Sequence, residues 1–144
     1  MTVLRKMKMR YIPFFALIVV SLILISSCVT PTRILQAGQF VLKPGESITS
    51  ADGSTKVTFA ELAEDSRCAT GVECVWAGQV KVLLEITFGT EIQQYTLVSG
   101  TKFEGNLDSI DIGDYSIRLT QVDPYPVYGQ DINPADYRVT LDIR

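Results

Sequence analysis

Apolar and polar side chains alternate one by one over residues 79–88, which is the period of a β-strand with one buried face. The same alternation returns near the C-terminus, over residues 137–143. The residues on the expected inner faces are Val80, Val82, Leu84, Ile86 and Phe88 in the first run and Tyr137, Val139, Leu141 and Ile143 in the second. Both segments are therefore predicted to be strands that pack on a shared core.

Weaker strands are predicted at residues 39–42, 46–49, 56–60, 92–98 and 115–122. Glycine-containing turn signals separate these runs, because glycine supplies the positive φ that tight turns require. The signals are Asp52-Gly53, Gly89-Thr90, Ser99-Gly100 and Ile112-Gly113-Asp114. One helical alternative exists, since Thr58 and Glu61 have capping-box spacing and residues 60–65 favour a short helix. About seven short strands predict an all-β domain, either an antiparallel β-sandwich or a partly open barrel.

The N-terminus follows a different pattern, that of a secretion signal. A basic segment precedes an apolar run from Ile12 to Ile25, and this run is shorter than the roughly 20 residues of a spanning helix. It ends in Ile25-Ser26-Ser27-Cys28, which resembles a bacterial or archaeal lipobox whose cysteine receives the lipid. We therefore expect cleavage after residue 27 and an anchor at Cys28, with an uncleaved signal anchor as the alternative.

This interpretation divides the chain into a signal peptide (1–27), a lipidated tether (28–38) and one all-β domain (39–144). The domain is expected at the cell membrane, facing away from the cytoplasm at the cell surface or in the periplasm. Losing the signal removes four of the 13 basic residues and none of the 16 acidic ones, so the net charge changes from -3 to -7. Nucleic acid is therefore not expected as a partner, because binding it requires a basic patch.

The most distinctive segment, residues 65–78, reads DSRCATGVECVWAG and directly precedes the strongest predicted strand. Cys68 and Cys74 lie close together in a chain expected outside the cytoplasm, so we predict a disulfide between them. Closing so short a loop contributes only about 2 kcal/mol, so its main effect is to fix the loop. Because the chain has no histidine to complete a zinc site, we expect no metal and no cofactor.

This segment resembles the motif of a family of small bacterial and archaeal secreted proteins and lipoproteins, D-S-R-C-P followed by a short spacer and C-x-W-A-G. The likeness extends to a late P-Y-P and a Y-R-V-T-L strand, matched here by residues 124–126 and 137–141. Ala69 stands where the family usually has proline. The resemblance supports the fold and the disulfide and implies no particular function.

Two residue groups in the motif are candidate binding residues, each with a structural alternative. Asp65, Ser66 and Arg67 could form a recognition patch, but such residues more often pair with each other or cap backbone donors. Trp76 could offer a stacking face for a sugar or a peptide, but a tryptophan beside a core strand is more often packed.

Residues 123–134 form the third candidate, a long loop with three prolines and the aromatic residues Tyr125 and Tyr128. Loops of this length without regular structure are often functional. The alternative is a rigid corner between sheets, with Tyr125-Pro126 as a candidate cis peptide.

Catalytic and calcium-binding chemistry find less support in the sequence. Without histidine, the commonest general base and the Ser-His and Cys-His pairs are excluded. Asp108, Asp111 and Asp114 recur near Glu104, but apolar residues interleave them and the spacing matches no EF-hand.

Three functional hypotheses follow. The first is a non-catalytic module that binds a protein, peptide or envelope glycan at the membrane surface. The second is an accessory or inhibitory lipoprotein that acts on a secreted enzyme or a membrane complex. The third is a carboxylate-dependent glycoside hydrolase. An exposed aromatic platform would favour the first, and two carboxylates facing each other across a cleft would favour the third.

Overall fold

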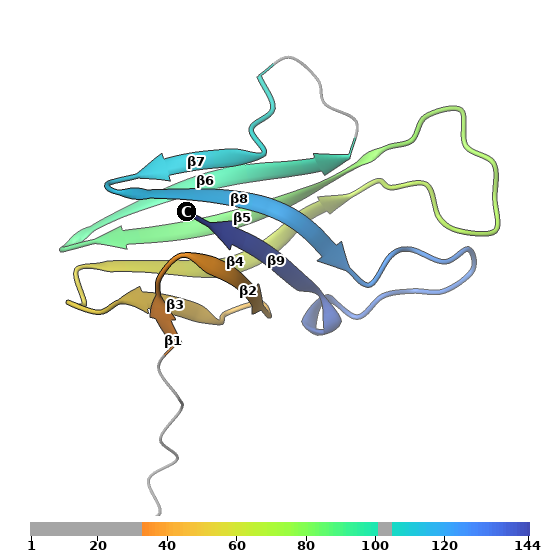
Figure 1. Ribbon diagram of the computed structural model, residues 1–144. Coiled ribbons are helices and arrows are strands. Elements are labelled where there is room, and N and C mark those ends of the chain that lie inside the picture. Colours follow the sequence, from red (N-terminus) through yellow and green to blue (C-terminus); the bar gives the residue numbers. More distant parts are fainter. Residues whose placement is uncertain (1–32, 101–104) are drawn as a thin grey trace, which may run out of the picture. The chain divides into compact units, whose positions relative to one another are not determined.

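The computed structural model describes residues 33–100 and 105–144 (Figure 1). The expected signal peptide, the lipid attachment at Cys28 and the first part of the tether lie outside these residues. Within the two described ranges, we find no helix with the length and apolar character needed to cross a membrane.

The described residues form nine strands, against about seven expected, in two sheets. The all-β fold is confirmed, and of the two predicted forms the structure agrees with the sandwich. One sheet has the order β1-β3-β4-β5-β6 and the other has the order β2-β9-β8-β7. All neighbouring strands within the sheets are antiparallel except β1 and β3, which are parallel. The strands are β1 (Arg33–Leu35), β2 (Gly38–Leu42), β3 (Ser47–Ser50), β4 (Thr55–Asp65), β5 (Gln79–Phe88), β6 (Glu91–Gly100), β7 (Ser109–Ile112), β8 (Tyr115–Asp123) and β9 (Arg138–Ile143), and a 3-10 turn, η1, spans Pro134–Asp136.

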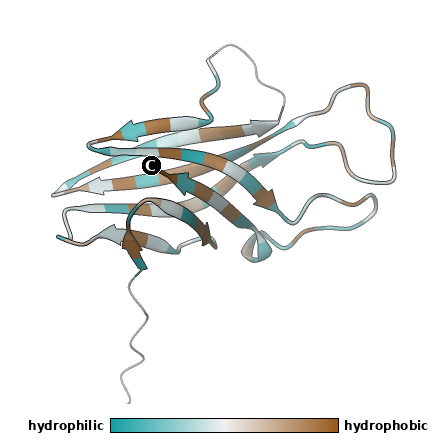
Figure 2. Cartoon of the chain, viewed as in Figure 1, coloured by the Kyte–Doolittle hydropathy of each residue, from teal (hydrophilic) through white to brown (hydrophobic). Residues whose placement is uncertain are grey.

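The core lies between the sheets, where the inward faces of the alternating strands meet. Along β5 and β9 every second side chain is buried, as the alternation predicts, and the hydropathy colours change from residue to residue along the ribbons (Figure 2). The largest buried side chains include Phe59 from β4, Leu84 from β5 and Leu141 from β9. Phe88 is an exception, because it ends β5 at the hairpin with β6 and is 58% exposed.

Three elements differ from the sequence-based expectations. The segment over residues 60–65 belongs to β4, so the helical alternative for it was wrong. Two shifts in register against β5, between Phe59 and Glu61 and between Leu62 and Glu64, break the alternation that would have marked a strand. The short strands β1 and β7 were not predicted, and β1 begins at Arg33, within the segment expected to be tether.

The two longest connections lie at the same end of the sandwich (Figure 1). One joins β4 to β5 and carries the cysteines, and the other joins β8 to β9 and carries the prolines. The tight β5–β6 hairpin lies at the opposite end of β5. The fold therefore brings together the two segments that the sequence singled out separately.

Candidate binding site

We call residues 66–78 the Cys loop and residues 124–137 the proline loop. Arg67 connects them through a buried cluster. Its guanidinium holds both carboxylate oxygens of Asp65, with Nε 2.8 Å from Oδ1 and Nη2 2.6 Å from Oδ2. Each of the two side chains is only 8% exposed. The hydroxyl of Tyr137 donates a further hydrogen bond of 3.1 Å to Asp65 Oδ2. The interpretation of Asp65 and Arg67 as a structural ion pair agrees with this geometry.

The cluster shifts the ionisation of all three members. Burial alone would raise the pKa of Asp65, but the hydrogen bonds and charge of Arg67 and the hydroxyl of Tyr137 outweigh it and lower that pKa. Burial would likewise lower the pKa of Arg67, and the Asp65 carboxylate raises it instead. Burial and the negative charge of Asp65 both raise the pKa of Tyr137. The ionised Asp65–Arg67 pair is thus the favoured state of the fold.

Arg67 also binds the main chain that enters the proline loop. Its Nη1 donates to the carbonyl of Val122 at 2.6 Å, and its Nη2 donates to the carbonyl of Pro124 at 2.9 Å. The guanidinium carbon lies 4.8 Å from the ring centre of Tyr125, close enough for a cation–π contact. One side chain of the Cys loop therefore holds both the backbone and a tyrosine ring of the proline loop.

The Cys loop continues this contact as a short parallel bridge. The amide of Thr70 donates to the carbonyl of Pro126 at 2.9 Å, and the amide of Tyr128 donates to the carbonyl of Thr70 at 3.0 Å. Arg67 and Thr70 together satisfy three alternate carbonyls, those of Val122, Pro124 and Pro126. A neighbouring strand would satisfy alternate carbonyls in the same way, so the Cys loop continues the edge of β8.

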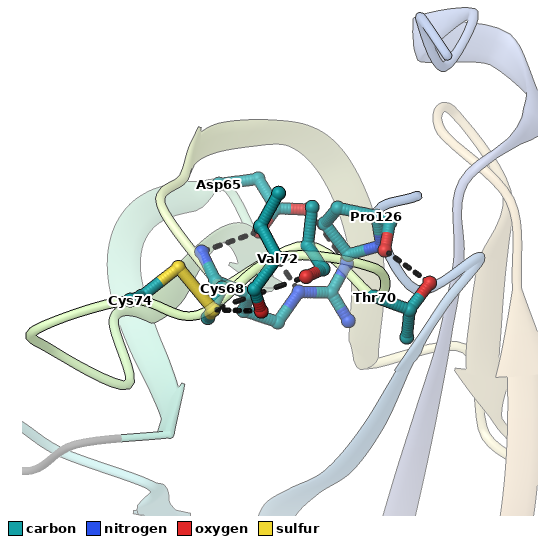
Figure 3. Close-up of a disulfide and its surroundings, with 8 residues drawn as sticks. Asp65, Cys68, Thr70, Val72, Cys74 and Pro126 are labelled. Atoms are coloured by element: carbon teal, nitrogen blue, oxygen red, sulfur yellow. Dashed lines mark hydrogen bonds and ion pairs between the residues drawn. A yellow bond between two sulfur atoms is a disulfide. The ribbon is translucent and has the colours of Figure 1, made fainter. Parts of the chain in front are cut away.

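The predicted disulfide between Cys68 and Cys74 is present and closes the Cys loop on itself (Figure 3). Main-chain hydrogen bonds from Ser66 to Gln79 and from Cys68 to Ala77 hold the two ends of the loop together. Gly78 is required here, since a Cβ at this position would lie 1.8 Å from the carbonyl oxygen of Ser66. The loop is thus fixed at its base, across its middle and against its neighbour.

The outer surface of the joined loops is apolar and aromatic. Trp76 is 77% exposed, so the expectation that it packs against the core was wrong. The chain places it ahead of Val80, the first buried residue of β5, and so beyond the space between the sheets. We define the apolar end as the six exposed side chains of the two loops, Val72, Val75, Trp76, Tyr125, Val127 and Tyr128.

Two shallow depressions adjoin these side chains and meet at Gly78. One, of about 620 Å³, is bordered by Val75 and Trp76. The other, of about 570 Å³, lies between the ends of β5, β6 and β8 and is bordered by Arg67 and Tyr125. A ligand could therefore contact both loops at once.

The proline loop itself differs from one detail of the sequence-based interpretation. The cis peptide joins Asp123 to Pro124, and not Tyr125 to Pro126. Near its other end, Asn133 Oδ1 accepts a hydrogen bond from the amide of Ala135 and caps η1. Tyr125 and Tyr128 remain exposed between these two fixed points.

The remaining candidates do not join this site. In the described part of the chain, no three acidic or cysteine side chains gather closely enough to hold a metal ion. Asp108 instead lies 3.4 Å from Arg118 on β8. The two loops could be singled out from the sequence, but the contacts of Arg67 with Val122 and Pro124 could not. These contacts join residues that are 55 and 57 positions apart in the chain.

Comparisons with known proteins give no relative from which a role could be carried over. No family model, no curated protein and no solved structure matches the chain. Any function must therefore be argued from the geometry of the joined loops.

Proposed function

We propose that this protein is a non-catalytic binding module, lipid-anchored at Cys28 and facing away from the cytoplasm, whose ligand contacts the apolar end. The observation that carries this proposal is the exposure of Trp76, Tyr125 and Tyr128 on two loops that are locked to each other. An exposed aromatic platform is the feature expected of a binding module rather than of a carboxylate-dependent hydrolase. An accessory or inhibitory lipoprotein would be a narrower form of the same function, acting through the same surface.

The rigidity of the platform supports this proposal. Buried aromatic side chains dominate the energetics of many protein interfaces, and binding costs less when they do not have to be ordered first. Here the disulfide, the Arg67 cluster and the Thr70 bridge fix the loops through contacts within the chain itself. Exposed loops that are fixed by several interactions are typical of a recognition site.

The anchor rests on the lipobox-like Ile25-Ser26-Ser27-Cys28 and sets the reach of the module. The five Cα steps from Cys28 to Arg33 span at most about 18 Å. A lipidated Cys28 would therefore keep β1 close to the membrane. Partners at the surface of that membrane are the ones within range.

Site-specific photo-crosslinking in the producing cells tests the function. A photoreactive residue at Val75 or at Tyr128 should give a discrete crosslinked product, because both positions belong to the apolar end. The same residue at Phe88 or Ile92 is the matched control, since both are exposed apolar side chains at the β5–β6 hairpin. No product at Val75 and Tyr128, or equal products at all four positions, would contradict the proposal.

A further inference from the structure

The exposed charged residues of the two loops that carry the apolar end are all acidic, and the combination of apolar and acidic side chains points to the chemistry of the partner. We propose that the apolar end binds a protein segment that carries Lys or Arg beside apolar side chains. This inference rests on the proposed function and deepens it. It excludes as main ligands an anionic surface, an acidic peptide and a neutral glycan.

The first support is the sign of the charges on the two loops. Glu73 on the Cys loop and Asp131 and Asp136 on the proline loop are exposed. None of the three forms an ion pair with another described residue. A cationic partner would be attracted to them, and complementary charge of this kind speeds and orients association.

The second support is that the loops offer no free cation. Arg67 is the only basic residue in either loop, and Asp65 already neutralises it within the buried cluster. Arg138, the next basic residue after the proline loop, donates to the main-chain carbonyl of Asp136. An acidic ligand would thus meet carboxylates and no unpaired positive charge on these loops.

The third support is the aromatic content of the surface. Trp76 and Tyr128 are more than two-thirds exposed, and about half of Tyr125 is accessible although Arg67 lies against its ring. The free faces of these rings attract Lys and Arg through their negative quadrupole. Aromatic rings and carboxylates therefore select for the same positive groups.

Three exposed valines decide between a protein and a glycan. Val72, Val75 and Val127 lie among the aromatic residues, and Val75 is 89% exposed. Aliphatic side chains gain from contact with other apolar side chains. They offer a sugar neither a flat stacking face nor a hydrogen bond, so they favour a partner with apolar side chains of its own.

Titration of synthetic peptides against the full chain, held in phosphatidylcholine nanodiscs, tests this partner class. The peptides share one length and one set of Leu and Trp positions and differ only in carrying Lys, Gln or Glu between them. We expect the Lys peptide to bind at least about tenfold more tightly than the Glu peptide. Its affinity should fall as NaCl is raised, because exposed charges are screened. A neutral chito- or cello-oligosaccharide serves as the glycan probe.

Paired variants locate the binding. Trp76→Ser with Tyr128→Ser should weaken the Lys peptide about tenfold, whereas the control Phe88→Ser with Ile92→Ser should change its affinity less than about twofold. Glu73→Gln with Asp131→Asn should weaken it about threefold or more, unlike the control Glu61→Gln with Glu91→Gln, which removes the same charge elsewhere.

The alternative outcomes are distinguishable. Loop-dependent binding of the oligosaccharide, or of peptides regardless of charge, would overturn the cationic partner and leave the binding module in place. Quenching of the fluorescence of Trp76, the one tryptophan of the chain, by brominated phosphatidylcholine in the nanodiscs, with no peptide bound, would make the apolar end a membrane contact. Peptide binding that the control variants weaken as much as the loop variants would overturn the site itself. The absence of peptide binding up to about 1 mM would overturn the partner class.

Discussion

The side chain of Arg67 donates hydrogen bonds to main-chain carbonyls at the end of β8, where a neighbouring strand would otherwise supply the donors. The strand β7 pairs with β8 only over Tyr115–Arg118, so the carbonyls of Val122 and Pro124 need another donor. The guanidinium supplies it while a second edge of the same planar group holds Asp65. Only a planar group with five donors can face both partners at once.

Arg67→Lys is therefore expected to lower the free energy of unfolding by about 2–4 kcal/mol, although it keeps the charge. A single ammonium cannot satisfy both carboxylate oxygens and both carbonyls, so it leaves buried polar groups unpaired. Urea unfolding at neutral pH measures the effect. Arg138→Lys, which alters an exposed side chain, is the control and should change stability by less than about 0.5 kcal/mol. Equal effects of the two variants would contradict the bridging role.

Asp65 is expected to make stability depend on pH in the acid range. Its pKa is lower in the fold than in the unfolded chain, so its contribution is complete above about pH 4 and is lost as the pH falls through the folded value. Asp65→Asn should be markedly less stable than wild type at pH 7, and this gap should narrow below about pH 4. Urea unfolding from pH 7 to pH 2 checks this. A gap that stays constant with pH would refute the linkage.

Residue roles could be predicted from the sequence only where neighbours in the chain determine them. The ion pair of Asp65 and Arg67 spans two positions, so local spacing suggested it. The exposure of Trp76 could not be read from the sequence, because it depends on how far the Cys loop extends past the last core layer. The same holds for Phe88, which continues the alternation of β5 but is exposed at the end of the strand.

Among the elements, β4 shows why alternation is an incomplete guide. From Thr55 to Phe59 every second side chain is buried, and the strand is visible in the sequence. The two register shifts that follow interrupt the alternation of buried and exposed side chains. The sequence pattern of this segment therefore indicates a short helix as an alternative to a strand. A bulge is set by pairing with β5, which a local pattern does not contain.

Gly78 is expected to be essential for the junction of the Cys loop with β5. Gly78→Ala would push a methyl group into the carbonyl of Ser66 and separate the hydrogen-bonded pair of Ser66 and Gln79. Gly89→Ala is the matched control, since Gly89 also has a positive φ but a Cβ added there would have no atom within 4 Å. We expect the Gly78 variant to lose roughly 2 kcal/mol more than the control in thermal or urea unfolding. Losses of the same size would show that backbone conformation alone, and not the close approach, requires glycine.

For the molecule as a whole, the sequence predicted the sandwich because both sheets have regular strands at their centre. It placed the edges less well, since β1 and β7 have three and four residues and too few positions to establish a period. It also could not show that the β4–β5 and β8–β9 connections meet, because strand order decides this. The sequence motifs mark the two connections, and the strand order places them side by side to form the candidate site.

The predicted lipid anchor at Cys28 can be tested separately from the stability of the sandwich. The described core begins at Leu35, after Cys28 in the sequence, so Cys28→Ser should leave the unfolding transition of the domain unchanged. It should nevertheless abolish lipid attachment and change the location of the protein, because the serine hydroxyl cannot replace the thiol. Mass spectrometry of the N-terminus and membrane fractionation measure the outcome. Ser27→Ala keeps a small residue before the cysteine and should be processed normally. A Cys28→Ser protein that is still processed and membrane-bound would mean that another feature holds the domain at the membrane, and the reach of the apolar end would then have to be measured from that feature.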